Sequence, residues 1–164
     1  MRYTPPIPKT QAETGNGVKK PIKSNMYMDA KLEDLAPYAH AIDGDANAEC
    51  LVLSYGEASQ PVRDALTSVS ARLGFGEPAF GDLSQLGTAK DAFALVEGID
   101  PVVVICADEL SGVMFGQAYR IQVPQNNAGR ALGRPFAAFV SFEEDLARSD
   151  MKQRDWAVMK SLVK

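Results

Sequence analysis

The stretch PVVVICA, residues 101–107, decides the class of fold. It opens on a proline and then carries only apolar side chains, which is typical of a strand buried on both faces of a parallel sheet. ECLVLSYGEA, residues 49–58, contains a similar apolar run and ends in a glycine turn. Both segments are therefore predicted to be central strands.

Apolar residues at helical spacing follow these strands. A helix is predicted over residues 61–73, with a proline in its first turn. A second predicted helix has a capping-box-like start at Thr88 and is closed by Gly98. A third is predicted over residues 110–118. Strands and helices therefore alternate along the middle of the chain.

The remaining segments continue this alternation. A leading helix is predicted from Asp29 to near Asp43 and Gly44, two more strands over residues 78–83 and 136–142, and a helix at the end of the chain. A loop rich in Asn and Gly precedes the last strand. We expect about four strands, with residues 136–142 parallel to residues 101–107. The predicted fold class is α/β, a three-layer α/β/α domain with a short, mainly parallel central sheet.

Length and composition indicate one globular domain. A chain of 164 residues closes a core without disulfides, metal ions or a cofactor, and none is predicted. Residues 1–28 are rich in Pro and Lys and are predicted to be a flexible arm, followed by the domain over residues 29–164. Cys50 and Cys106 lie in apolar runs and are predicted to be buried thiols. The sequence has no membrane-spanning apolar run and no secretory signal, so a cytoplasmic protein is predicted.

Charge is unevenly distributed along the chain, whose net charge is -4. Residues 1–119 hold 9 Lys or Arg and 16 Asp or Glu, whereas residues 120–164 hold 8 and 5. The acidic balance argues against a protein that coats nucleic acid indiscriminately. The basic excess of the last third is consistent with a solvated surface or with a phosphate-binding face.

Acidic residues at the predicted strand ends are the candidate catalytic groups, because ligands of such sheets bind beyond the carboxyl ends of the strands. The candidates are Glu57, Asp82 and Glu109. Glu57 is the best placed to act as a general base, and an acid near a helix N-terminus is equally expected on electrostatic grounds alone. Asp108 is explained by helix capping without any chemistry.

Other polar motifs are predicted to be structural. His40, the only histidine, lies on the leading helix, far in sequence from the strand ends, and has no second histidine or paired cysteine. It is therefore predicted to be a structural or surface residue. DGDANAE, residues 43–49, imitates the start of a calcium loop, but Ala48 replaces the required glycine. A turn is predicted there, and no metal site.

Taken in order, these segments resemble the uracil-DNA glycosylase superfamily, in particular its bacterial type-4-like branch, over about residues 29–164. Where the family has a strand ending in Gly-Glu-Ala-Pro-Gly, this chain has ECLVLSYGEA. Residues 98–116 are similar to its Pro-x-Val-Ile-Val-x-x-Gly strand and the helix that follows. Residues 136–162 are similar to its closing strand, its His-Pro-Ser loop with a downstream Arg, and its Lys-x-x-x-Trp helix. The matching positions in this last segment are Arg148, Lys152 and Trp156.

The departures from the family imply a scaffold without its chemistry. Phe142 stands where a histidine would stabilise the departing uracil anion, and a phenyl ring cannot replace imidazole there. Ser59 and Gln60 replace the Pro-Gly of the first motif, and the Asn that would bind the uracil edge is missing near Asp82. The four cysteines of the branch's iron-sulfur cluster are also absent from the sequence. The resemblance implies that ligand or nucleic acid would contact Gly56, Glu57, Gln60, Phe142, Arg148 and Lys152.

Three functions follow from these patterns. The first is a non-catalytic module that binds DNA or a replication or repair protein, as the psi subunits of bacterial clamp loaders share the fold without the chemistry. The second is a divergent DNA glycosylase or hydrolase that uses a strand-end carboxylate as its base. The third is a small-molecule-binding flavodoxin-like domain, for which the sequence offers no phosphate-binding loop.

Overall fold

The structure is a computed structural model that describes residues 22–163. The chain divides into two compact units, with the boundary after Asp34. The described part of the first unit is residues 22–34 of helix α1 (Ile22–Leu35). Residues 1–21 of the arm predicted over residues 1–28 lie outside the described residues. Residues 22–28 contain no proline or glycine and are helical, so α1 begins seven residues before the predicted start.

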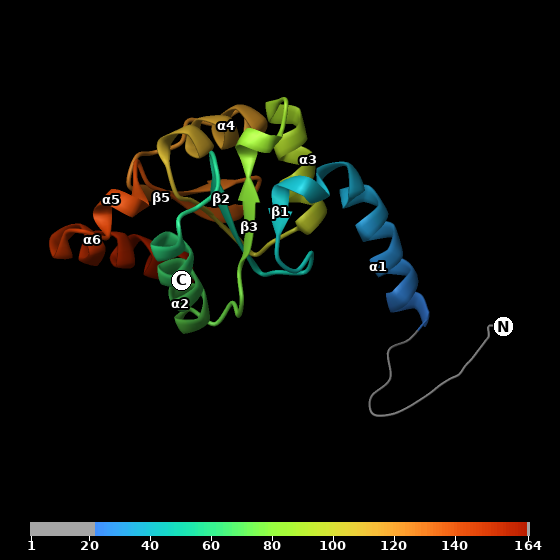
Figure 1. Ribbon diagram of the computed structural model, residues 1–164, viewed down its shortest axis with the longest axis horizontal. Coiled ribbons are helices and arrows are strands. Elements are labelled where there is room, and N and C mark those ends of the chain that lie inside the picture. Colours follow the sequence, from blue (N-terminus) through green and yellow to red (C-terminus); the bar gives the residue numbers. More distant parts are fainter. Residues whose placement is uncertain (1–21, 164) are drawn as a thin grey trace. The chain divides into compact units, whose positions relative to one another are not determined.

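A six-stranded sheet forms the centre of the second unit, in the order β1-β3-β2-β4-β6-β5 (Figure 1). Its four inner strands are parallel, and they are β3 (Ala79–Asp82), β2 (Cys50–Ser54), β4 (Val103–Cys106) and β6 (Arg134–Ala138). The edge strands, β1 (Ile42–Asp43) and β5 (Asn127–Ala131), run antiparallel to their neighbours. The predicted parallel pairing of the last inner strand with residues 101–107 is confirmed, with Val104 opposite Phe136.

Helices cover both faces of this sheet, which confirms the predicted three-layer α/β/α class (Figure 1). Helices α3 (Ala89–Ile99) and α4 (Glu109–Tyr119) pack on one face. The other face is covered by α2 (Gln60–Arg72), α5 (Phe142–Asp145) and α6 (Ser149–Lys160). The 3-10 helices η1 (Ala36–Ala41), η2 (Leu83–Gln85) and η3 (Ser161–Val163) complete the unit.

The strands show why their sequences are continuously apolar. Leu51 and Leu53 belong to the core cluster beneath α3 and α4, whereas Val52 belongs to the cluster beneath α2 and α6. Val104 and Ile105 divide in the same way between the two clusters. Successive side chains of a strand point to opposite faces, so a sheet covered on both sides buries every position.

Two predicted helix boundaries are corrected by the structure. The leading helix ends at Leu35, and residues 36–41 form the 3-10 helix η1, which has a proline in its first turn. Gly98 does not close α3, because the helix continues to Ile99 and is capped by Asp100 in the left-handed conformation. A Cβ on Gly98 would lie 2.5 Å from Leu35 Cδ2, so this glycine permits close packing rather than termination.

The predicted Asn- and Gly-rich loop contains strand β5, which the sequence pattern did not reveal. β5 and β6 form a hairpin whose two turn residues, Leu132 and Gly133, both have positive φ. This is the conformation of a two-residue primed turn, which matches the twist of paired strands. β6 itself ends at Ala138, because Ser141 caps α5 and Phe142 is already helical.

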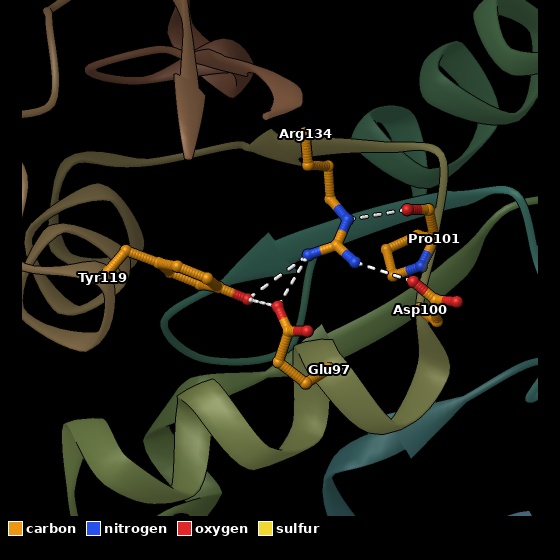
Figure 2. Close-up of polar contacts among 5 residues, drawn as sticks. All are labelled: Glu97, Asp100, Pro101, Tyr119 and Arg134. Carbon is orange, nitrogen blue, oxygen red and sulfur yellow. Dashed lines mark hydrogen bonds and ion pairs between the residues drawn. The ribbon is translucent and has the colours of Figure 1, made fainter. Parts of the chain in front are cut away.

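A partly buried arginine ties the elements together at the amino end of the inner strands (Figure 2). Arg134, at the start of β6, donates to the Pro101 carbonyl and to the carboxylates of Glu97 and Asp100 at 2.7 to 2.9 Å. Tyr119 donates to the same Glu97 at 2.6 Å. These contacts join the ends of α3 and α4 to β6 and hold the edge of the sheet opposite the predicted site.

Candidate functional site

The loop after β2 is held by carboxylates from both neighbouring strands. The Tyr55 amide donates to the Asp108 carboxylate at 3.0 Å, and the Gly56 amide donates to Asp82 Oδ1 at 2.7 Å. Ser54 Oγ donates to the Gly56 carbonyl at 2.7 Å. Gly56 has a φ of 106°, which a side chain would strain. The carboxyl edge of the sheet is therefore fixed by side-chain to backbone hydrogen bonds.

Asp82 is one of the predicted catalytic candidates, and its contacts are those of a structural anchor. Besides Gly56, it accepts from the amide and the hydroxyl of Ser84, at 3.0 and 2.7 Å, and caps η2. Partial burial acts to raise the pKa of Asp82, but the hydrogen bonds from Ser84 and Gly56 outweigh it and hold the pKa below its ordinary value. A carboxylate held ionised in this way is a weak base.

Asp108 caps α4, as the sequence predicted. Its carboxylate accepts from the Ser111 amide at 2.9 Å, and the Ser111 hydroxyl faces the Asp108 amide in return, which completes a capping box. The bond from Tyr55 adds a long-range contact to this local one. The same aspartate thus starts a helix and fastens the neighbouring loop.

Glu57 lines a cavity of about 260 Å³ beside β3 and η2. Ser54, Asp82 and His40 line the same cavity. His40 Nε2 lies 3.0 Å from the Gln85 carbonyl oxygen, within hydrogen-bonding distance. His40 is far from the strand ends in sequence, but the pairing of β1 with β3 carries the turn that precedes β1 to the tip of β3. Its side chain is exposed, as expected of a surface residue.

Glu109, the third candidate, is exposed in the first turn of α4 and lines a different cavity. This second cavity has a volume of about 560 Å³ and lies between α4, the segment after it and the end of β6. The structure therefore brings Glu57 and Asp82 to one cavity and leaves Glu109 in the other. Gln60 is exposed at the start of α2, where its amide donates to Asp64 at 2.7 Å.

The loop that resembles the family's His-Pro-Ser loop presents no catalytic side chain at Phe142. Its ring is buried, packs against Phe139 with centroids 5.4 Å apart, and belongs to the core beneath α2 and α6. The Phe142 amide donates to the Ala107 carbonyl at 2.9 Å, which fixes the backbone as well. The predicted role of Phe142 in ligand contact is corrected, because the ring offers no surface to a ligand in this structure.

Arg148 and Lys152 are exposed at the start of α6, one helical turn apart. Arg148 lies 3.5 Å from Asp150, an exposed pair that contributes little to stability. Two other arginines of the C-terminal third are more tightly engaged. Arg134 binds Glu97 and Asp100, and Arg154 binds Asp145 and Asp155.

The α/β unit is acidic as a whole. Residues 35–164 hold 11 Lys or Arg and 17 Asp or Glu, and two of the arginines are bound by two carboxylates each. Only part of the basic excess of residues 120–164 is therefore neutralised inside the fold. The exposed basic residues in the described part of this segment are Arg120, Arg130, Arg148, Lys152 and Lys160. They lie on a unit whose net charge is negative, which weakens its attraction for a phosphate backbone.

Both cysteines are buried and unpaired, as predicted. Burial raises the pKa of Cys50 to about 11 and raises that of Cys106 further. Among residues 22–163, no cluster of three His, Cys, Asp or Glu has the arrangement of a metal site. In the same part of the chain, no helix is long and apolar enough to cross a membrane.

Comparison with known proteins adds no assignment. Neither the known protein-family models nor the curated proteins contain a match to this chain.

Proposed function

We propose that the protein is a non-catalytic, uracil-DNA glycosylase-like module that binds a protein partner in replication or repair. The observation that carries the proposal is the use of Asp82 and Asp108 as anchors for the loop after β2. Catalytic carboxylates need a pKa matched to proton transfer, and Asp82 has its pKa lowered by backbone and serine donors. The side chain at the position of the family's histidine is a buried phenyl ring.

The surface of the α/β unit suits a protein partner better than it suits DNA. The α/β unit carries an excess of acidic residues, and Arg134 and Arg154 are bound to internal carboxylates. Arg148 and Lys152, the exposed basic residues at positions that match the family, support DNA as the alternative partner. Two neutralised phosphates supply only a small part of the affinity of a DNA-binding protein. Buried free thiols fit a cytoplasmic location.

The second candidate is a divergent glycosylase or hydrolase with Glu57 as its base. One specific observation favours it, which is that Glu57, His40 and Asp82 line a single cavity at the carboxyl edge of the sheet. Water activated by Glu57 would be the nucleophile in such an enzyme. The lowered pKa of Asp82 leaves Glu57 as the candidate base in that cavity.

Uracil excision distinguishes the two functions. The full chain is incubated with single-stranded and duplex oligonucleotides that each contain one uracil, and abasic sites are cleaved with alkali and resolved on a gel. We expect no cleavage above the buffer control, because the family's uracil-binding and anion-stabilising groups are missing. Glu77→Gln is the control, because Glu77 is an exposed glutamate that lines neither of the two strand-end cavities. Cleavage that is lost in Glu57→Gln and retained in Glu77→Gln would replace the binding function with the enzymatic one.

A further inference from the structure

The cavity of about 560 Å³ is an open groove between α4 and the chain that follows it. Two buried glycines of α4, Gly112 and Gly116, let residues 121–124 approach the helix closely. A Cβ on Gly116 would lie 3.0 Å from the Ile121 carbonyl oxygen and 3.1 Å from Val123 Cγ2. The glycines therefore define one wall of the groove, and the end of β6 provides the other.

Residues 121–124 carry unused backbone groups along this wall. The segment lies outside the sheet, and its first amide, that of Ile121, donates to the Gly116 carbonyl. The next two amides, those of Gln122 and Val123, form no hydrogen bond within the described chain. Backbone donors and acceptors beside an apolar groove are the features by which proteins bind extended peptides.

Apolar side chains line the middle of the groove, and charges lie at its two ends. Val113 and Val140 line it and are 51% and 36% exposed. Glu109 lies at the first turn of α4, and Arg120 caps its last turn. The two residues are eleven positions apart along the helix, which corresponds to a rise of about 16 Å. About five residues of extended chain have the same length.

We propose that this groove binds an extended peptide segment of a partner protein. The segment has apolar residues at its centre, a basic residue beside Glu109 and an acidic residue beside Arg120, because opposite charges at the two ends fix the direction of the peptide. The proposal rests on the proposed protein-binding function and names its site and the chemical class of its ligand.

A selection from a random nine-residue peptide library tests the site on the full chain. We expect enriched peptides with an apolar centre between a basic and an acidic residue. The most enriched peptide is then labelled, and its binding is measured by fluorescence anisotropy. Val113→Asp and Val140→Asp, which place a charge on opposite walls, are expected to weaken binding at least tenfold. Leu110→Asp is the matched control, because Leu110 is 58% exposed on α4 and does not line the groove.

Three results would overturn the proposal. The first is that no peptide is enriched over beads without the protein. The second is that Val113→Asp binds the peptide as tightly as wild type does. The third is that single-stranded DNA displaces the peptide and that the binding of this DNA is lost in Val113→Asp. A negative result in the peptide measurement would not change the expected absence of uracil excision. Uracil excision by the chain would remove the proposed function without changing the peptide measurement.

Discussion

Asp82, at the end of β3, and Asp155, buried in α6, have pKa values shifted in opposite directions. Asp82 accepts backbone and serine hydrogen bonds, and these hold its pKa below the ordinary value although burial opposes them. Asp155 is 1% exposed, and burial together with the neighbouring Asp145 raises its pKa to about 7. Its Oδ2 atom is buried without a hydrogen-bond partner among the described residues.

The carboxyl group with the strongly raised pKa, that of Asp155, is not part of the predicted site at the strand ends. Strongly raised carboxyl pKa values are concentrated at functional sites, yet here the raised pKa belongs to a residue of α6 that lines neither of the two strand-end cavities. Arg154 bonds both Asp145 and Asp155 through one guanidinium nitrogen, at 2.8 and 2.9 Å. Burial, together with a second carboxylate on the same cation, favours retention of a proton on Asp155 and explains its raised pKa without any catalytic role.

The largest effect is expected from Asp155→Asn. A folded-state pKa near 7, above the ordinary 3.8, means that the folded protein binds the extra proton between about pH 4 and 7. Ionisation of Asp155 therefore lowers stability as pH rises through that window, by up to about 4 kcal/mol at 1.36 kcal/mol per pH unit. The variant should gain stability over wild type by up to this amount above pH 7 and by little at pH 4.

Urea unfolding at pH 4, 5.5, 7 and 8 measures that difference. Asp150→Asn is the control, because Asp150 is an exposed aspartate of the same helix and should give a small difference at every pH. A difference between Asp155→Asn and wild type that is the same at pH 4 and pH 8 would show that Asp155 does not carry the proton.

The second largest effect is expected from Arg134→Gln at the amino edge of the sheet (Figure 2). The arginine side chain is 12% exposed, and its loss removes the donor to the Pro101 carbonyl and leaves Glu97 with the hydrogen bond from Tyr119 alone. We expect a loss of about 2 to 3 kcal/mol in the free energy of unfolding, reduced by the partial exposure of Glu97.

The exposed pair of Arg148 and Asp150 provides the comparison for this measurement. Arg148→Gln removes an equivalent charge from an ion pair that lies in solvent, and should cost less than about 0.5 kcal/mol. Equal losses in the two variants would mean that the Arg134 contacts contribute no more than a surface ion pair.

The parts of the fold that burial controls could be predicted from the sequence. Residues 50–53 and 103–107 are apolar because both faces of their strands are covered. Asp108 was predicted to cap its helix because capping is local. The edge strands β1 and β5 could not be predicted. β1 has two residues, and β5 depends on a partner strand and on a turn with Leu132 at positive φ, which is rare for leucine.

The candidate site was predictable in place but not in role. The sequence located Glu57 and Asp82 at strand ends, and the structure places them at one cavity. It gave no signal for His40, whose position depends on the pairing of β1 with β3. Nor could it show that Asp82 and Asp108 hold the amides of Gly56 and Tyr55, since these contacts join residues 26 and 53 positions apart.

The most direct test of the central claim is the stability of Asp82→Ala and Asp108→Ala, set against Glu57→Gln. Urea unfolding can be followed by the fluorescence of Trp156, the only tryptophan. If the two aspartates are anchors, each alanine variant loses about 1 to 2 kcal/mol, the cost of backbone donors and a helix cap left without a partner, while Glu57→Gln stays within about 0.5 kcal/mol of wild type. Alanine variants as stable as wild type, or more stable, would contradict the claim, because residues held for chemistry commonly reduce stability.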